Sequence, residues 1–401
     1  MRVIYLDAAL VGELGHFAGA CRSVTAALRK AGHEVIVCGH QQVAAGLKDE
    51  LQVQPLFRLH PNARLNEDPL CGWLSTHLQV TKITNEDLAR IQGVTANDLV
   101  VYDCPRPAQI SAVVQWAQQQ FRPESCPRII FLPGWPTGVA VERGESGVAT
   151  AWRILDQLSC LYRFAAQQIH PAFRTKIRFG CPDISGTAAE AYQFLLNYPV
   201  SALPAFQRAT VDSRDRTTVT DPVVAFLGEQ RFDKGYPLVP GIVRDLLAKE
   251  LQLKILVQNS WDKLEEQNRE LQEIAARDTR LTLRIGTLSK QEWHQQLFEA
   301  DLVVLPYHPS TYGTNISGVG AEALANGIPQ VVPANTGMAR LVQRYGNPGV
   351  IVPASEQAAF VDGVMQAVQT YQALAARAAA AREQWANENT PENLAAALCN
   401  G

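Results

Sequence analysis

The sequence lacks the features that would direct a chain to a membrane, a disulfide framework or a metal. It has no apolar run long enough to span a bilayer, and residues 1–6 lead straight into a strand pattern without a signal peptide. The eight cysteines include no Cys-x-x-Cys pair, and the eight histidines show no metal-ligand spacing. We therefore expect a cytoplasmic protein with buried free thiols, no cofactor and no obligatory metal.

Charge is also scarce. The net charge is −3 and charged residues make up 19% of the chain, so no global attraction to nucleic acid is expected. A local cluster of Arg174, Lys176 and Arg178 is either a solvated loop or a contact for an anionic acceptor or lipid headgroup. Contact with a membrane is therefore expected to be peripheral at most.

What the sequence does contain is a repeated alternation of strand and helix patterns. At 401 residues the chain is long enough for two domains. In the first half, strands are predicted at Val3–Leu6, Glu34–Val37, Leu99–Tyr102 and Ile129–Leu132, and helices at Phe17–Lys30, about Ala149–Ala166 and Gly186–Leu196. This spacing is typical of parallel strands joined by crossover helices.

The second half repeats the scheme after a polar stretch. Strands are predicted at Val223–Leu227, Leu253–Val257, Leu281–Ile285, Leu302–Leu305 and Gln330–Val332, and helices at Leu238–Lys249, Trp261–Arg277, Lys290–Glu299 and within Gln357–Ala386. We predict an α/β protein with two doubly wound, Rossmann-like domains facing across a cleft. The expected divisions are 1–206 for an N-terminal acceptor-side domain, 207–221 for a linker and 222–372 for a donor domain. A C-terminal helix at 373–401 is expected to pack back on the first domain.

The loop from Gly228 to Gly235 is the first candidate binding element. Arg231 and Lys234 lie between a predicted buried strand and a helix opened by Pro237. Two cations beside a helix N-terminus complement a diphosphate, because charge-assisted hydrogen bonds and the helix dipole both favour an anion. Solvated loop cations are the alternative that the spacing leaves open.

A second candidate is the loop after strand Val3–Leu6, which ends in Gly15 and His16. Glycine allows close backbone approach to a ligand, and the following helix start attracts an anion. His16 either donates to a phosphate or sugar hydroxyl, or simply caps the helix.

The segment from Tyr307 to Pro329 carries the most information. It places a polar loop, a short helix with Glu322, and Gly327 where a left-handed residue ends a helix. Gly318–Ala323 fits the G-x-G-x-x-A fingerprint, but a long loop separates it from the preceding strand and no acidic residue closes the next one. Dinucleotide binding is therefore rejected, and no P-loop supports an ATPase.

These motifs resemble the retaining GT-B glycosyltransferases of family 4, the "group 1" transferases. Gly228, Lys234 and Gly235 match the family's G-R-x-x-x-x-K-G loop, and Glu322–Pro329 matches its E-A-x-A-x-G-x-P segment. The resemblance covers residues 222–355 well and residues 1–40 weakly. It departs from the family pattern at Glu229, at Thr314, which replaces the first glutamate of a pair, and at Phe131–Pro136, which lacks an expected histidine.

The resemblance implies roles for particular residues. Lys234, with Gly235 and Arg231, would bind the donor diphosphate, and Glu322 would accept hydrogen bonds from the ribose hydroxyls. Gly15 and His16 belong to the same expected site. The segment expected to cover the diphosphate and face the donor sugar is Thr314, Asn315, Ile316, Ser317, Gly318 and Val319.

We therefore expect a glycosyltransferase that moves a sugar from a nucleotide-diphosphate sugar to a hydroxyl acceptor with retention of configuration. The acceptor would be a carbohydrate, a lipid-linked compound or a small molecule. A GT-B sugar-nucleotide epimerase or phosphorylase is the alternative among enzymes. A non-catalytic sugar-binding protein is the alternative from another class, because Thr314 and the absent histidine remove expected groups.

Overall fold

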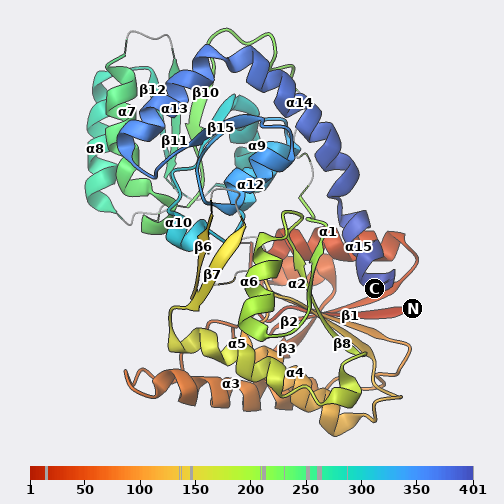
Figure 1. Ribbon diagram of the computed structural model, residues 1–401. Coiled ribbons are helices and arrows are strands. Elements are labelled where there is room, and N and C mark those ends of the chain that lie inside the picture. Colours follow the sequence, from red (N-terminus) through yellow and green to blue (C-terminus); the bar gives the residue numbers. More distant parts are fainter. Residues whose placement is uncertain are drawn as a thin grey trace. The chain divides into compact units, whose positions relative to one another are not determined.

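The computed structural model describes residues 1–13, 17–134, 136, 138–144, 148–207, 209, 214–229, 231–249, 253–259, 264–286 and 288–400. The chain forms two compact units, each built on its own sheet (Figure 1). Unit 1 comprises Met1–Gly144, Ala149–Phe206 and Thr390–Gly401, and unit 2 is built on Gln207–Asn389.

Unit 1 contains a seven-stranded parallel sheet in the order β3-β2-β1-β4-β5-β8-β9. Its strands are β1 (Arg2–Leu6), β2 (Glu34–His40), β3 (Val53–Phe57), β4 (Leu99–Asp103), β5 (Arg128–Leu132), β8 (Ile177–Pro182) and β9 (Val200–Leu203). The helices of the unit are α1 (Phe17–Lys30), α2 (Ala45–Leu51), α3 (Gly72–Leu88), α4 (Pro107–Gln120), α5 (Gln157–Gln167), α6 (Thr187–Leu196) and α15 (Pro391–Asn400), with a 3-10 turn η1 (Pro171–Phe173). A separate antiparallel hairpin is formed by β6 (Val139–Arg143) and β7 (Ala149–Ile154).

Both faces of this sheet are covered, as the uninterrupted apolar strands predict. Side chains alternate across a strand, so Val3 and Tyr5 of β1 pack with α1 and α15, whereas Ile4 and Leu6 pack in the core that includes α4, α5 and α6. Leu394 on α15 is buried in the first of these cores, which fixes the end of the chain on unit 1.

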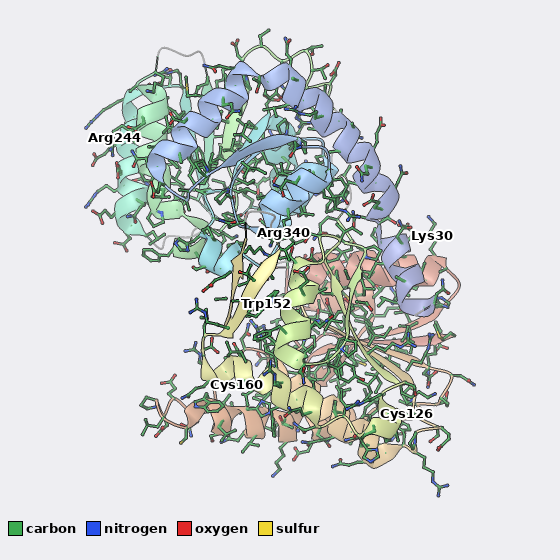
Figure 2. The ribbon with its side chains drawn as sticks, in the orientation of Figure 1. Lys30, Cys126, Trp152, Cys160, Arg244 and Arg340 are labelled. Atoms are coloured by element: carbon green, nitrogen blue, oxygen red, sulfur yellow. The ribbon has the colours of Figure 1, made fainter. Side chains whose placement is uncertain are left out.

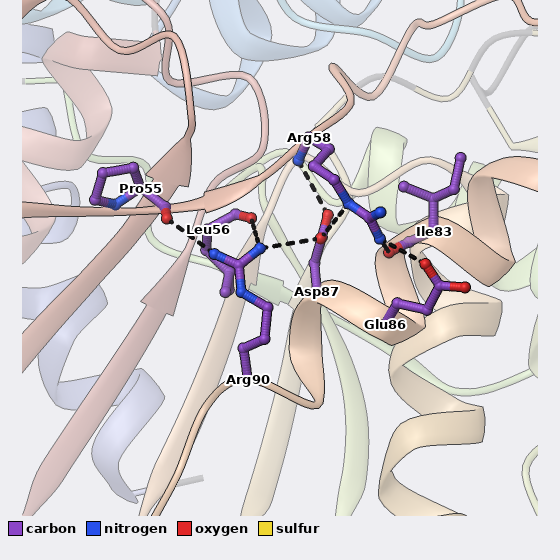
Figure 3. A network of polar contacts seen from close by, with 7 residues as sticks. All are labelled: Pro55, Leu56, Arg58, Ile83, Glu86, Asp87 and Arg90. Carbon is purple, nitrogen blue, oxygen red and sulfur yellow. Dashed lines mark hydrogen bonds and ion pairs between the residues drawn. The ribbon is translucent and has the colours of Figure 1, made fainter.

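An ion-pair network fastens α3 to the chain that follows β3 (Figure 3). The buried carboxylate of Asp87 accepts hydrogen bonds from the backbone N–H of Arg58 (3.0 Å) and from its Nε (2.6 Å). Arg58 also donates to Glu86 (2.7 Å), and Arg90 donates to Asp87 and to the carbonyl of Leu56. A buried carboxylate is tolerated here because several donors replace its water shell.

Unit 2 contains a six-stranded parallel sheet in the order β12-β11-β10-β13-β14-β15. Its strands are β10 (Val223–Phe226), β11 (Lys254–Asn259), β12 (Leu281–Ile285), β13 (Leu302–Val304), β14 (Gln330–Pro333) and β15 (Gly349–Val352). The helices of the unit are α7 (Val239–Leu247), α8 (Glu265–Arg277), α9 (Lys290–Glu299), α10 (Pro309–Tyr312), α11 (Gly318–Ala325), α12 (Gly337–Arg344), α13 (Gln357–Gln369) and α14 (Tyr371–Glu388), with 3-10 turns η2 (Phe232–Lys234) and η3 (Tyr236–Leu238). The predicted pair of doubly wound parallel sheets is thus confirmed.

Arg216, which lies in the polar stretch expected to be a linker (207–221), is held within unit 2. Only 4% of this residue is exposed, and its guanidinium donates to the carbonyls of Ala300 and Asn326 (both 3.2 Å) and of Leu297 (3.3 Å). Asp301 lies 3.8 Å away and supplies the opposite charge. Composition shows that this stretch is polar, but it does not show which backbone carbonyls accept hydrogen bonds from Arg216.

Two local predictions differ from the structure. The helix predicted over Ala149–Ala166 is wrong in its first part, because Ala149–Ile154 is strand β7, paired with β6, and α5 begins at Gln157. Apolar residues in this stretch fit both periodicities, and hairpin pairing decides between them. At the C-terminus, α14 packs on unit 2, with Leu374 in its core, and the part of 373–401 that belongs to unit 1 begins at Thr390.

None of the helices among the described residues is long and apolar enough to cross a membrane.

The carboxyl edge of the unit 1 sheet holds two buried carboxyl groups, one after β1 and one at the end of β4. Tyr5 Oη donates to Asp103 Oδ2 (2.8 Å), and the backbone N–H of Ala9 donates to Asp7 Oδ1 (2.8 Å). Asp7 is fully buried, and its Oδ2 has no hydrogen-bond partner among the described residues. Burial, and next the charge of Asp103, raise the pKa of Asp7 well above its ordinary value.

We expect Asp7→Asn to stabilise the protein more at pH 8 than at pH 4. A carboxyl group whose pKa is higher in the folded than in the unfolded state costs stability progressively as pH rises through the unfolded value, and asparagine does not titrate. Thermal unfolding at both pH values measures the difference. The exposed Asp49→Asn is the control, and an Asp7→Asn effect equal at the two pH values would contradict the assignment.

Candidate functional site

The candidate site of unit 2 lies at the topological switch point of its sheet. β10 is flanked by β11 on one side and β13 on the other, so the chain leaves the carboxyl ends of β10 and β13 in different directions. Open α/β sheets bind ligands at this position. The loop after β10 carries Gly228 to Gly235, and the segment after β13 carries Tyr307 and leads to α11.

Gly228, Lys234 and the first turn of α11 converge on one point. A Cβ added to Gly228 would lie 3.6 Å from Lys234 Nζ and 3.2 Å from Val319 Cγ2. Gly228 has φ of +108°, and its N–H donates to the side chain of Gln258 at the end of β11 (3.0 Å). The two motifs separated in sequence are therefore adjacent in space.

The Lys234 ammonium is half-buried and has no ion-pair partner among the described residues. Its Nζ lies 5.8 Å from the centroid of the Tyr307 ring, which is within the range of a cation–π contact. Burial, and next the charge of Arg231, lower the pKa of Lys234 to about 8. An ammonium that lacks a carboxylate partner in such surroundings is suited to an anionic ligand.

Arg231, by contrast, is held by its own neighbours. Its guanidinium donates to both oxygens of Asp233 (3.0 and 2.9 Å), to Glu229 (3.4 Å) and to Tyr312 Oη (2.9 Å). The sequence proposed Arg231 as a second diphosphate cation. In the structure its guanidinium is engaged by two carboxylates, whereas Lys234 forms no ion pair of its own among the described residues.

Gly235 holds the loop against the segment after β13. It has φ of +68°, in the left-handed region, and a Cβ at this position would lie 1.8 Å from the carbonyl oxygen of Pro306. The backbone N–H of His308 also donates to the carbonyl of Asp233 (2.9 Å). A glycine is required here for both its conformation and its size.

The start of α11 faces the same point. Ser317 caps the helix, with its hydroxyl accepting from the N–H of Gly320 (3.4 Å), and that hydroxyl also lies 3.1 Å from Tyr307 Oη. The first amides of a helix have no intrahelical acceptor, so the N–H groups of Gly318 and Val319 suit an anion. The N–H of Ser317 is already used, because it donates to the sulfur of Met338 (3.0 Å).

The segment before α11 is packed rather than open. Thr314 is 3% exposed and Asn315 is 2% exposed, while Ile316 is half-buried. Asn315 donates through Nδ2 to the carbonyl of Thr311 (2.9 Å), and its own Oδ1 has no partner among the described residues. Arg340 of α12, labelled in Figure 2, donates to the carbonyl of Gly313 and fixes the segment from the other side.

Glu322 lies one turn into α11 and is half-buried. Its Oε2 accepts a short hydrogen bond from Nε1 of Trp293 in α9 (2.6 Å). Burial raises the pKa of Glu322, and the indole N–H opposes that shift by favouring the ionised form. Sequence reasoning noted Trp293 only as a position between the two motifs that agrees with the family, and gave it no role in the site.

Two candidates from the first domain, Gly15 and His16, lie outside the described residues. Among the residues that the structure covers, no group of three His, Cys, Asp or Glu side chains could hold a metal ion. The expectation that no metal is needed stays a prediction.

Comparisons with known proteins bear on the family and the fold. Residues 223–398 match the family described as Family 4 Glycosyltransferase in conflict systems. The matched segment, which lies in the second half of the chain, is thus similar to family 4 glycosyltransferases, and the whole chain has the GT-B fold. None of the curated proteins matches the sequence.

Several solved structures share the fold over 99–100% of this chain. Sucrose-phosphate synthase from Thermosynechococcus elongatus has a TM-score of 0.66 at 15% identity, covering 100% of this chain and 98% of that chain. HepE of Anabaena, solved in complex with UDP, has a TM-score of 0.62 at 12% identity, covering 100% and 99%. A putative UDP-N-acetylglucosamine 2-epimerase from Listeria monocytogenes has a TM-score of 0.58 at 11% identity, covering 99% and 94%.

We expect Gly235→Ala to destabilise unit 2 by about 2–4 kcal/mol, because it adds both a strained backbone and a steric clash with Pro306. Calorimetric unfolding measures the loss. Gly346→Ala is the matched control: Gly346 has φ of +79° but no atom within 4 Å of its added Cβ, so it isolates the backbone strain. Equal losses in the two variants would contradict the close packing of Gly235.

Proposed function

We propose that this GT4-like protein transfers a sugar from a nucleotide-diphosphate sugar to a hydroxyl acceptor. The observation that carries the proposal is the half-buried Lys234 ammonium, which forms no ion pair among the described residues and lies beside Gly228 and the first turn of α11. This arrangement supplies a positive charge, a glycine that lets a ligand approach the backbone closely, and the N–H groups of Gly318 and Val319 at the helix start. A diphosphate fits all three.

Glu322 is placed to bind the nucleoside part of the donor. It lies one turn along the same helix, and its Oε1 has no hydrogen-bond partner among the described residues. A carboxylate accepts hydrogen bonds only, so vicinal ribose hydroxyls are suitable donors. The GT-B structures solved with UDP and UDP-glucose support this choice of ligand class.

The chemistry follows from charge development at the diphosphate. The bond between the anomeric carbon and the diphosphate oxygen breaks, a bond to the acceptor oxygen forms, and the acceptor proton passes to the departing phosphate. Lys234 and the amides of α11 stabilise the negative charge that grows on the leaving oxygen. Retention of configuration, and a carbohydrate, lipid-linked or small-molecule acceptor, are the outcomes that the family resemblance implies.

A GT-B epimerase or phosphorylase would use the same donor pocket with water or orthophosphate in place of the acceptor. A sugar-binding protein without activity is the other candidate, and the buried Thr314 at the expected carboxylate position favours it. A thermal-shift panel of UDP-, GDP- and ADP-sugars, followed by mass analysis of products with hydroxyl acceptors, separates these functions. Binding of a nucleotide sugar without turnover would favour the sugar-binding protein over our proposal.

We expect Lys234→Ala to weaken binding of the preferred nucleoside diphosphate by about 1.5–3 kcal/mol, the range for a hydrogen bond to a charged group. Isothermal titration calorimetry measures the change. Lys254→Ala is the matched control, because that lysine is exposed at the opposite end of β11. An unchanged affinity in Lys234→Ala would remove the basis of the diphosphate site.

The affinity for nucleoside diphosphate should also fall as pH rises through about 8, the value to which burial lowers the pKa of Lys234. The ligand binds the protonated amine. Above this pH, each pH unit should therefore lower the affinity about tenfold until a second group begins to titrate. Calorimetry at pH 7 and pH 9 tests the sign. The dependence should disappear in Lys234→Arg, whose guanidinium stays charged over this range.

A further inference from the structure

The carboxylate of Glu322 is oriented by one contact from a neighbouring helix. Trp293 stands in the first turn of α9, which Ser289 and Glu292 cap reciprocally, so the position of the indole is fixed by a well-formed helix start. Its Nε1 donates to Glu322 Oε2 at 2.6 Å. Glu322 has no other side-chain hydrogen bond among the described residues, which leaves Oε1 available to a ligand.

This contact is also what favours the ionised carboxylate. Burial raises the pKa of Glu322, and the indole N–H is the one group that shifts it in the opposite direction. No cation forms an ion pair with Glu322 within the described part of the chain. A carboxylate that receives one strong hydrogen bond is held in one rotamer. It can still accept hydrogen bonds from a ligand, because each of its oxygens can accept more than one.

We propose that Trp293 is a positioning residue that gives the donor site its preference for a nucleoside diphosphate over pyrophosphate by orienting Glu322 toward the ribose hydroxyls. This inference rests on the proposed function. It assigns the ligand selectivity of Glu322 to a residue outside the motifs that suggested the site. A tryptophan is suited to the role, because its indole donates a hydrogen bond and accepts none, and therefore always presents the N–H to the carboxylate.

The test is the affinity of Trp293→Phe for UDP, GDP and ADP and for pyrophosphate, measured by calorimetry. Phenylalanine keeps an aromatic ring but has no N–H. We expect the affinity for the preferred nucleoside diphosphate to fall about tenfold, close to the lower limit for a hydrogen bond to a charged group, with the affinity for pyrophosphate kept within about twofold. Retained pyrophosphate binding also shows that unit 2 is folded.

Two further measurements separate positioning from a general structural effect. Added to Glu322→Gln, the Trp293→Phe change should have little further effect, because the two residues act through one contact. The affinity of Trp293→Phe should also decline more steeply than that of the unaltered protein as pH is lowered, since loss of the N–H raises the pKa of Glu322 further.

Trp385→Phe is the matched control. Trp385 is a buried tryptophan of unit 2 whose Nε1 donates to the carbonyl of Gln207 (2.8 Å), so this change removes the same kind of hydrogen bond away from the site. It should leave the ratio of nucleoside diphosphate to pyrophosphate affinity unchanged.

The outcomes distinguish the two proposals. If the unaltered protein binds no nucleoside diphosphate, the proposed function fails and this inference fails with it. If it binds one and Trp293→Phe binds it equally well, or loses pyrophosphate to the same extent, the positioning role of Trp293 is wrong and the proposed function stands.

Discussion

The contact between Gly235 and the carbonyl of Pro306 is the constraint on which the donor site depends. It brings the loop after β10 against the segment after β13, two stretches far apart in sequence. With the loops in contact, Lys234 lies near Gly228 and near the ring of Tyr307, whose hydroxyl in turn meets the cap of α11. A side chain at residue 235 would separate these groups.

Charge is distributed unevenly over this site. Arg231 is matched by Asp233 and Glu229, so its role is to hold the loop in place through Tyr312 of the adjoining segment. Lys234 has no such partner and loses part of its hydration, which is why its pKa falls to about 8. An ammonium without an ion pair of its own beside a helix start is suited to an anionic ligand.

The two sheets share one topology but differ in what they place at the switch point. In unit 1 the carboxyl edge carries Asp7 and Asp103, with Tyr5 donating to the second. In unit 2 the same edge carries an ammonium and the amides of α11. The same topology therefore carries two buried carboxyl groups in one unit and a half-buried ammonium in the other, because side chains on strand-end loops, and not the fold, set what a site can bind.

The sequence by itself determined the α/β alternation and the limits of helices such as α1 and α9, and it predicted Lys234 and Glu322 as parts of one site. Those features depend on periodicity, caps and motif spacing, which are local. Tertiary structure alone decided that Ala149–Ile154 is a strand, that Arg231 is engaged by two carboxylates, that Arg216 is held within unit 2, and that Trp293 holds Glu322. Each of these features depends on a contact between residues that packing brings together. A single sequence gives the residues but not their neighbours in space.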